Sequence, residues 1–346
     1  MNPYAKLAFS LSLILGTTLT ISSNHWMMAW TGLEINTLAI IPLISKHHHP
    51  RAIEAAIKYF LVQAAASTLL LFSSTINAWH TGQWDITQLN HPTSSLLLTA
   101  AVAMKLGLVP FHFWFPEVLQ GSPLTTAMLL STVMKFPPIT ILLLTSHSLN
   151  PTLLTMMAIA SAALGGWMGL NQTQIRKILA FSSISHLGWM TIILIYNPKL
   201  TLMTFYLYCV MTAAIFLTLN TTKSLKLSTM MTSWAKTPTL NASLMVTLLS
   251  LAGLPPLTGF LPKWLIIQEL SKQDMTTTAT IIALLSLLSL FFYLRLAYYS
   301  TITLPPSPTN HMKQWYTSKP ANTLIATLTS LSTLLLPMSP MILASI

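Results

Sequence analysis

The chain has 346 residues, of which 53% are hydrophobic and only 7% are charged. Soluble domains carry roughly 25% charged residues, so this composition excludes a water-soluble globule and indicates a surface that faces lipid. The formal net charge is +11, but the basic residues are scattered between apolar runs and form no patch that would bind nucleic acid. The single cysteine, Cys209, excludes a disulfide framework and a cysteine metal site within the chain.

Apolar runs long enough to cross a bilayer as helices follow one another along the whole chain. The first is interpreted as a membrane helix and not as a signal peptide, because it lacks a convincing cleavage site and similar runs continue after it. The ninth is too long for one crossing and carries "AGLPPLTGFLP", which predicts a broken helix. About eleven spans are predicted, at 3–22, 25–44, 58–78, 95–115, 123–145, 151–170, 178–196, 200–220, 240–270, 276–297 and 322–341.

Basic residues in the loops indicate how these spans are oriented. If the N-terminus lies inside, only Lys199 and Lys272 fall on the outer side. Such an asymmetry follows the positive-inside rule and supports the number of spans. The inner side then collects Lys6, Lys46, Arg51, Lys58, Arg176, Lys177, Lys223, Lys226, Lys236, Arg295, Lys313 and Lys319.

Two spans share an interrupted pattern. "GLVPFHFWFP" begins at Gly107 and "GLPPLTGFLP" begins at Gly253, and both read G-L-x-P, then five residues, then Pro. Five crossings separate the copies, so they run in opposite directions, as in transporters built from inverted repeats. Proline removes a backbone donor and breaks a helix. Discontinuous helices are therefore predicted near 105–116 and 250–263, with non-helical backbone at about 107–110 and 253–259.

Four ionisable residues lie close to the middle of separate predicted spans, Glu34, Lys105, Lys135 and His186, and Lys263 lies just past the break in the ninth span. A charge at the bilayer centre costs roughly 2.5–3.5 kcal/mol on insertion scales, so such residues need a role. One interpretation is a proton relay, because a buried amine holds its proton less tightly and a nearby carboxylate strengthens that hold. The alternative is a structural ion pair between helices. In both cases Glu34 and Lys105, in the same half, are predicted to form a close pair.

Histidines give weaker signals. His112, in the first interrupted segment, and His186, beside a run of serines, are candidates for the proton path, and the alternative for each is a packed histidine. The triplet at 47–49 has no acidic or cysteine partner nearby, so no metal site is predicted there. The sequence also has no phosphate-binding glycine loop, no cysteine cluster for iron–sulfur and no paired-histidine pattern for haem.

Five stretches carry a resemblance that covers essentially the whole chain: "HWMMAWTGLEINTLAIIPLI", "EAAIKYFLVQAAAS", "MKLGLVPFHFWFPEVLQG", "NQTQIRKILAFSSISHLGWM" and "LSLAGLPPLTGFLPKW". They closely resemble the vertebrate mitochondrial subunit 2 family of NADH dehydrogenases, which are antiporter-like membrane subunits of respiratory complex I. The resemblance implies two inverted five-helix repeats at about 1–146 and 150–300 within one domain, 1–346, and a terminal helix at about 321–343. It also implies that Glu34, Lys105, Lys135 and Lys263 lie on the proton path.

The resemblance further implies an all-α polytopic protein of the inner mitochondrial membrane, with its N-terminus in the matrix and its C-terminus towards the intermembrane space. Its expected function is proton translocation coupled to electron transfer from NADH to ubiquinone. No cofactor or metal is expected in this chain, since flavin, iron–sulfur clusters and ubiquinone belong to other subunits. Expected partners are neighbouring antiporter-like and small membrane subunits, and lipids such as cardiolipin.

Longer members of the family have three more helices at the N-terminus, and a neighbouring subunit is expected to cover the side that these would occupy. Two rival functions remain. A self-standing cation/proton antiporter would not require the large redox assembly. A passive scaffold would not need lysines at mid-membrane.

Overall fold

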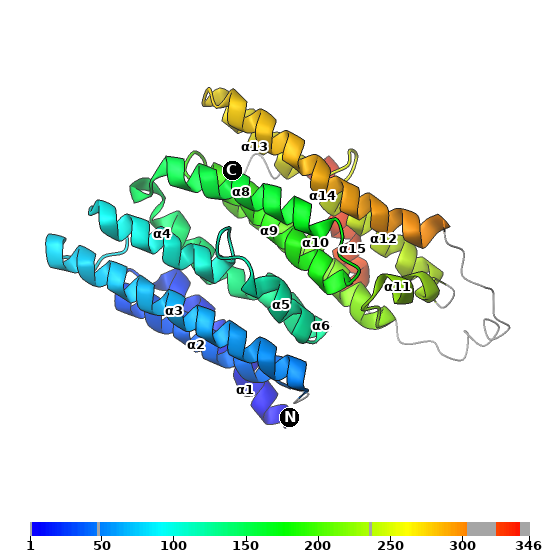
Figure 1. Ribbon diagram of the computed structural model, residues 1–346, viewed down its shortest axis with the longest axis horizontal. Helices are drawn as coiled ribbons and strands as arrows, with labels where there is room; N and C mark the ends of the chain where they lie inside the picture. The colour runs from blue at the N-terminus through cyan, green and yellow to red at the C-terminus, as the bar shows by residue number, and fades with distance from the viewer. Residues whose placement is uncertain (1, 47–48, 235–236, 303–322, 340–346) are drawn as a thin grey trace. The chain divides into compact units, whose positions relative to one another are not determined.

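The computed structural model describes residues 2–46, 49–234, 237–302 and 323–339, and it is built from helices (Figure 1). Within these ranges the only extended pairing is two isolated bridges, His25 with Asp85 and Gln174 with Lys226. The predicted all-α class is therefore confirmed. Some residues named in the sequence analysis lie outside the described ranges. They are the basic residues Lys236, Lys313 and Lys319, the histidines His47 and His48, and both ends of the predicted helix 321–343.

The chain divides by its internal contacts into two compact units, which are described one at a time. The first unit comprises Met1–Ser161 and Met190–Pro198, and the second comprises Ala162–Trp189 and Lys199–Ile346. The predicted single domain and the repeat boundaries near 146 and 150 stay predictions.

The helices of the first unit follow the predicted spans one to five. In Figure 1 they run from blue to green along the chain. They are α1 (Pro3–Ser22), α2 (Trp26–Ile44), α3 (Pro50–Thr81), α4 (Pro92–Leu106), α5 (Trp114–Gly121), α6 (Leu124–Ser131), the 3₁₀ turn η1 (Val133–Lys135), α7 (Phe136–Leu144) and the 3₁₀ turn η2 (Ser146–Ser148).

Spans six to eleven are also helical, and most of them lie in the second unit. Their helices are α8 (Pro151–Gly169) and α9 (Ile175–Ile193), which are shared between the units, then α10 (Pro198–Thr222), α11 (Leu227–Ser233), α12 (Pro238–Ala252), α13 (Phe260–Lys272), α14 (Thr276–Ile302), α15 (Thr323–Leu334) and η4 (Leu336–Met338). Seven stretches are long and apolar enough to cross a membrane: α1, α2, α3, Leu124–Leu144, α8, α10 and α14.

Proline and glycine set many of the helix ends. Proline is the first residue of α1, α3, α4, α8, α10 and α12, where its missing donor costs nothing because the first helical N–H groups have no partner. Left-handed glycines end three helices: Gly82 after α3, Gly107 after α4 and Gly253 after α12. Their positive φ angles of 72°, 76° and 81° are conformations that side-chain-bearing residues disfavour.

The two predicted breaks are confirmed and match each other closely. Residues 107–113 separate α4 from α5, and residues 253–259 separate α12 from α13. In each copy a left-handed glycine ends the first helix, and the second helix begins seven residues later, at Trp114 and at Phe260. The first break extends three residues beyond the predicted 107–110.

A third break lies in span five, which was predicted to be continuous. The α-helix ends at Ser131, a 3₁₀ turn covers Val133–Lys135, and α7 begins at Phe136. Pro137 and Pro138 have no N–H to donate back to the residues of this turn, so the regular hydrogen-bond ladder stops there. The buried lysine of this span therefore lies in an irregular turn.

Helix α3 is longer than the predicted span 58–78. It runs through 32 residues, about 48 Å at 1.5 Å per residue, whereas the hydrocarbon core of a bilayer is about 30 Å thick. The excess lies mainly at its N-terminal end, where Glu54 and Lys58 are exposed. The first turns of α3 therefore extend beyond the hydrocarbon core.

Helices α1 and α2 lie side by side in close contact (Figure 1). Glycines allow this approach, because a Cβ built on Gly16 would lie 2.8 Å from the Gly32 carbonyl oxygen, and one on Gly32 would lie 2.6 Å from Thr20 Cγ2. Small residues at a helix crossing let backbones meet closely in a membrane. Away from this contact, α1 exposes Tyr4, Leu7, Leu11, Ile14 and Leu15, an apolar surface suited to lipid or to a neighbouring chain.

We expect Gly32→Val to lower the amount of assembled protein. The added side chain would meet the backbone of α1, and overpacking of this kind costs roughly 1–3 kcal/mol. The measurement is the amount of the subunit in the assembled complex on native gels. Gly82→Asn is the control, because nothing lies within 4 Å of a Cβ at Gly82 and asparagine tolerates its backbone conformation. Normal assembly of Gly32→Val would show that α1 and α2 need no close contact.

Candidate functional site

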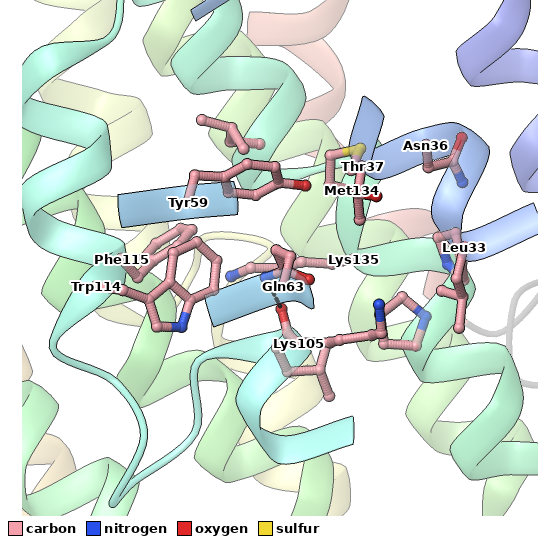
Figure 2. Close-up of a pocket in the computed structure, with 14 residues that line it drawn as sticks. Leu33, Asn36, Thr37, Tyr59, Gln63, Lys105, Trp114, Phe115, Met134 and Lys135 are labelled. Atoms are coloured by element: carbon pink, nitrogen blue, oxygen red, sulfur yellow. Dashed lines mark hydrogen bonds between the residues drawn. The ribbon is translucent and has the colours of Figure 1, made fainter. Parts of the chain in front are cut away.

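The first unit contains a small cavity lined by polar and aromatic side chains (Figure 2). Its volume is about 20 Å³, measured as the space open to the centre of a water molecule, which is room for about one water. The lining residues come from α2, from α3, from both sides of the α4–α5 break and from both sides of the turn in span five: Leu33, Asn36, Thr37, Tyr59, Gln63, Lys105, Leu106, Trp114, Phe115, Leu130, Met134, Lys135, Pro137 and Pro138.

Lys105 lies in the last turn of α4, directly before the first break, and is 6% exposed. Its ammonium is near the carbonyl end of the helix, where the helix dipole favours positive charge. Among the described residues its Nζ has no hydrogen-bond partner. Its backbone is held differently: Gln63 Nε2 of α3 donates to the Lys105 carbonyl oxygen at 3.4 Å, and Trp114 Nε1 donates to the Met104 carbonyl oxygen at 3.1 Å.

Glu34 is half-buried on α2, and Thr37 Oγ1 donates to its Oε2 at 3.2 Å. Its charge acts on Lys105 electrostatically. No salt bridge within 4.0 Å joins Glu34 to Lys105 in the described part of the chain, so the predicted close pair is not a direct ion pair. The carboxylate therefore acts on the amine from a greater distance, and Thr37, which lines the cavity, holds its position.

Lys135 is 3% exposed and is the last residue of the 3₁₀ turn in span five. Its Nζ lies 4.9 Å from the centroid of the Phe115 ring, a cation–π contact with the wall that follows the first break. Lys135 and Lys105 line the same cavity (Figure 2). Two amines beside one small cavity repel each other when both are charged.

Lys263 belongs to the second unit and is tied to the second break. It lies in the first turn of α13, and its Nζ donates to the carbonyl oxygen of Ala252, the last residue of α12, at 2.7 Å. The same amine lies 5.9 Å from the centroid of the Trp189 ring on α9. A Cβ at Gly253 would lie 2.9 Å from Lys263 Cδ and 3.0 Å from its Nζ, so glycine makes room for the lysine.

The two candidate histidines lie in different places. His112 is in the first break and 1% exposed, with neither ring nitrogen hydrogen-bonded among the described residues, and it does not line the cavity. His186 lies on α9 in the second unit, with its ring 5.5 Å from that of Tyr208. Their part in a proton path stays a prediction. In the described residues, no three His, Cys, Asp or Glu side chains are grouped as for a metal ion.

Sequence reasoning missed the neutral polar residues of the cavity. Asn36, Thr37, Tyr59 and Gln63 all line it, yet only Glu34, three lysines and two histidines were identified as candidates. The sequence did contain an indication of these polar residues, because Gln63 is an amide in the middle of the apolar run "YFLVQAAAS". A buried amide in a membrane helix needs partners within the protein, which would have indicated a polar interior at this depth.

Comparison with known proteins identifies the family of the chain. The profile of the family described as NADH:quinone oxidoreductase/Mrp antiporter, transmembrane region, matches residues 23–289, and that of the NADH dehydrogenase subunit 2 C-terminus matches residues 290–343. The chain is 79% identical over 346 residues to NADH-ubiquinone oxidoreductase chain 2 of Struthio camelus, with 100% of both chains covered. It is 74% identical over 342 residues to that of Gallus gallus, with 99% of each covered.

Solved structures give the same result for the fold. A chain in the structure of respiratory complex I from Thermus thermophilus has a TM-score of 0.84 and 26% identity, covering 97% of this chain and 80% of that one. A chain of the Mrp complex from Dietzia is similar in fold, with a TM-score of 0.83, 17% identity, and coverage of 97% and 75%. The chain thus belongs to the antiporter-like membrane subunits of NADH:quinone oxidoreductase, in the chain 2 family, and the resemblance drawn from the sequence is confirmed.

We expect Gly253→Ala to lower proton pumping more than Gly107→Ala does. Both changes place a side chain at positive φ, which costs roughly 1–2 kcal/mol. Only at Gly253 does the new Cβ also displace the Lys263 amine, since at Gly107 the nearest atom lies at an ordinary 3.5 Å. The measurement is NADH-driven proton uptake per assembled complex. Equal uptake in the two variants would show that the position of the Lys263 amine has no part in pumping.

Proposed function

We propose that this chain is a proton-translocating membrane-arm subunit of respiratory complex I, coupled to electron transfer from NADH to ubiquinone. The observation that carries the proposal is that Lys105 and Lys135 are buried, line one water-sized cavity and lie at helix breaks. Burial weakens the hold of an amine on its proton and a carboxylate strengthens it, so an amine placed beside water-sized space is suited to accept and release a proton. A scaffold would gain nothing from charges placed at this cost.

The residues of the first unit have separate roles in this proposal. Lys105 receives a proton, and the Glu34 charge stabilises it there. Movement of the Glu34 carboxylate away from the cavity weakens this stabilisation and favours transfer through the cavity to Lys135. Phe115, under the Lys135 ammonium, stabilises the charge at its destination without offering a competing acceptor.

In the second unit, Lys263 is the candidate for the corresponding step. Its ammonium is bonded to the Ala252 carbonyl oxygen and lies over the Trp189 ring, so it has an acceptor and an aromatic face but no carboxylate within salt-bridge distance among the described residues. His186 and His112 are further candidates for carrying protons. The order in which the three lysines exchange a proton is part of the proposal.

The energy for pumping has to come from other subunits. The sequence has no cysteine cluster and no nucleotide loop, so in this proposal flavin, iron–sulfur clusters and ubiquinone are bound elsewhere and this chain binds no cofactor. Its partners are other subunits of complex I, including neighbouring antiporter-like and small membrane subunits. Anionic lipids such as cardiolipin are further proposed partners, favoured by the excess of basic residues on one side of the membrane.

The proposed location is the inner mitochondrial membrane. The vertebrate relatives support a mitochondrial place. The distribution of basic residues supports an N-terminus in the matrix and, after an odd number of spans, a C-terminus towards the intermembrane space.

We expect Lys105→Ala and Lys135→Ala each to lower coupled proton pumping by at least about tenfold while the complex still assembles, because a positioned proton-transfer group contributes roughly 100-fold or more to its step. Replacing a buried charge by a small apolar group does not disrupt a membrane helix, although Glu34 is left without a nearby cation. The measurement is NADH-driven proton uptake in vesicles together with the amount of assembled complex.

Lys272→Ala is a suitable control for these variants. Lys272 is an exposed lysine at the end of α13, paired with Glu269 at 3.5 Å, so its loss should leave pumping unchanged. Full pumping with normal assembly in both Lys105→Ala and Lys135→Ala would contradict the relay and leave a structural role for the two lysines as the better account.

A further inference from the structure

Helix α3 contacts the chain on both sides of the first break through one stripe of its surface. The stripe consists of Arg51, Ala55, Tyr59 and Gln63, which are four residues apart and so lie on one face of the helix. Upstream of the break, Gln63 Nε2 donates to the Lys105 carbonyl oxygen at 3.4 Å.

Downstream of the break, the same stripe meets α5. The Tyr59 ring lies edge-on to the Trp114 ring, with centroids 5.8 Å apart. At the end of α5, a Cβ on Gly121 would lie 2.5 Å from Ala55 Cβ and 2.6 Å from the Arg51 carbonyl oxygen, so the two backbones touch there. Helix α3 therefore fixes the distance between the two halves of the broken span.

Lys58, beside this stripe, adds the one charged link between α3 and α5 in the described part of the chain. Its Nζ lies 2.5 Å from Glu54 Oε1 in the preceding turn of α3, and 2.7 Å from Glu117 Oε2 on α5. Glu117 is two residues after Phe115, whose ring supports the Lys135 amine, and three residues after Trp114, which lines the cavity. A shift of α5 would therefore move the wall of the cavity directly.

We propose that Lys58 is a positioning residue for proton transfer: by bonding Glu117 it holds α5 against α3, and so holds Trp114 and Phe115 in place around the cavity. The inference rests on the proposed proton-translocating function. It assigns no proton to Lys58, Glu54 or Glu117 themselves, whose side chains are 41%, 61% and 51% exposed. Their part is to fix the geometry in which Lys105 and Lys135 exchange a proton.

The two carboxylates provide a matched pair for the test. Glu54 and Glu117 bond the same amine at similar distances, but only Glu117 lies on α5. Glu117→Gln should therefore lower the number of protons pumped per NADH, and Glu54→Gln should leave it near the wild-type value. An exposed ion pair shifts an equilibrium by at most about fivefold, so a two- to fivefold decrease is expected for Glu117→Gln.

Variants of Lys58 separate positioning from simple loss of stability. Lys58→Met, which removes the charge, should lower the pumping ratio as Glu117→Gln does, and Lys58→Arg, which keeps charge and reach, should restore it. If both residues act through one contact, the double variant Lys58→Met with Glu117→Gln should be no worse than either single variant. The experiment uses the assembled complex in vesicles, with pumping expressed per NADH oxidised and per assembled complex.

Lys135→Ala, measured in the same experiments, separates the positioning role of Lys58 from the proposed proton-translocating function. If Lys135→Ala lowers pumping and the Lys58 and Glu117 variants do not, the positioning role is wrong and the proposed function stands. If Lys135→Ala also pumps normally, the proposed function itself is wrong. Equal losses in Glu54→Gln and Glu117→Gln would overturn the inference even if Lys58→Met fails to assemble, because the link to α5 would then have no special part.

Discussion

Backbone carbonyl groups at the ends of the broken helices have no partner in their own helix, and the rest of the structure depends on how they are satisfied at membrane depth. Lipid tails offer no hydrogen-bond partner, so the partners must come from the protein or from water held within it. In the first break they are Gln63 and Trp114. In the second break the partner is Lys263, an ammonium that both satisfies a carbonyl and carries a titratable charge. The Lys263 ammonium therefore satisfies a carbonyl group of the second break and, in the proposed relay, also carries the proton.

All three mid-span lysines lie at interruptions of a helix. Lys105 is in the last turn before the first break, Lys135 is in a 3₁₀ turn, and Lys263 is in the first turn after the second break. A regular helix uses its own carbonyl groups and leaves none for a side chain, whereas a break exposes carbonyl groups and opens space beside them. For Lys263 the break supplies an acceptor, the Ala252 carbonyl oxygen, in place of a carboxylate.

Much of the fold could be predicted from the sequence, because apolar length and proline position are local properties. The spans and the breaks at Gly107 and Gly253 follow directly from them. The turn at Lys135 was missed because "KFPP" lies in an apolar run whose hydropathy gives no sign of a break. The absence of a direct Glu34–Lys105 ion pair from the described residues has a different reason. The free-energy cost of a charged side chain at the bilayer centre predicts that the charge needs a compensating partner. It does not predict whether a carboxylate or the end of a helix supplies that partner.

The size of the cavity has a mechanical consequence. An ammonium has three N–H donors, and the Lys105 Nζ has no acceptor among the described residues, while the cavity has room for about one water molecule. Satisfying a charged Lys105 fully requires more space than this shape offers, so the walls have to part or the side chain has to swing towards another acceptor. In the proposed relay, loading a proton on Lys105 is thereby linked to a change in internal volume, and the step becomes one on which hydrostatic pressure acts.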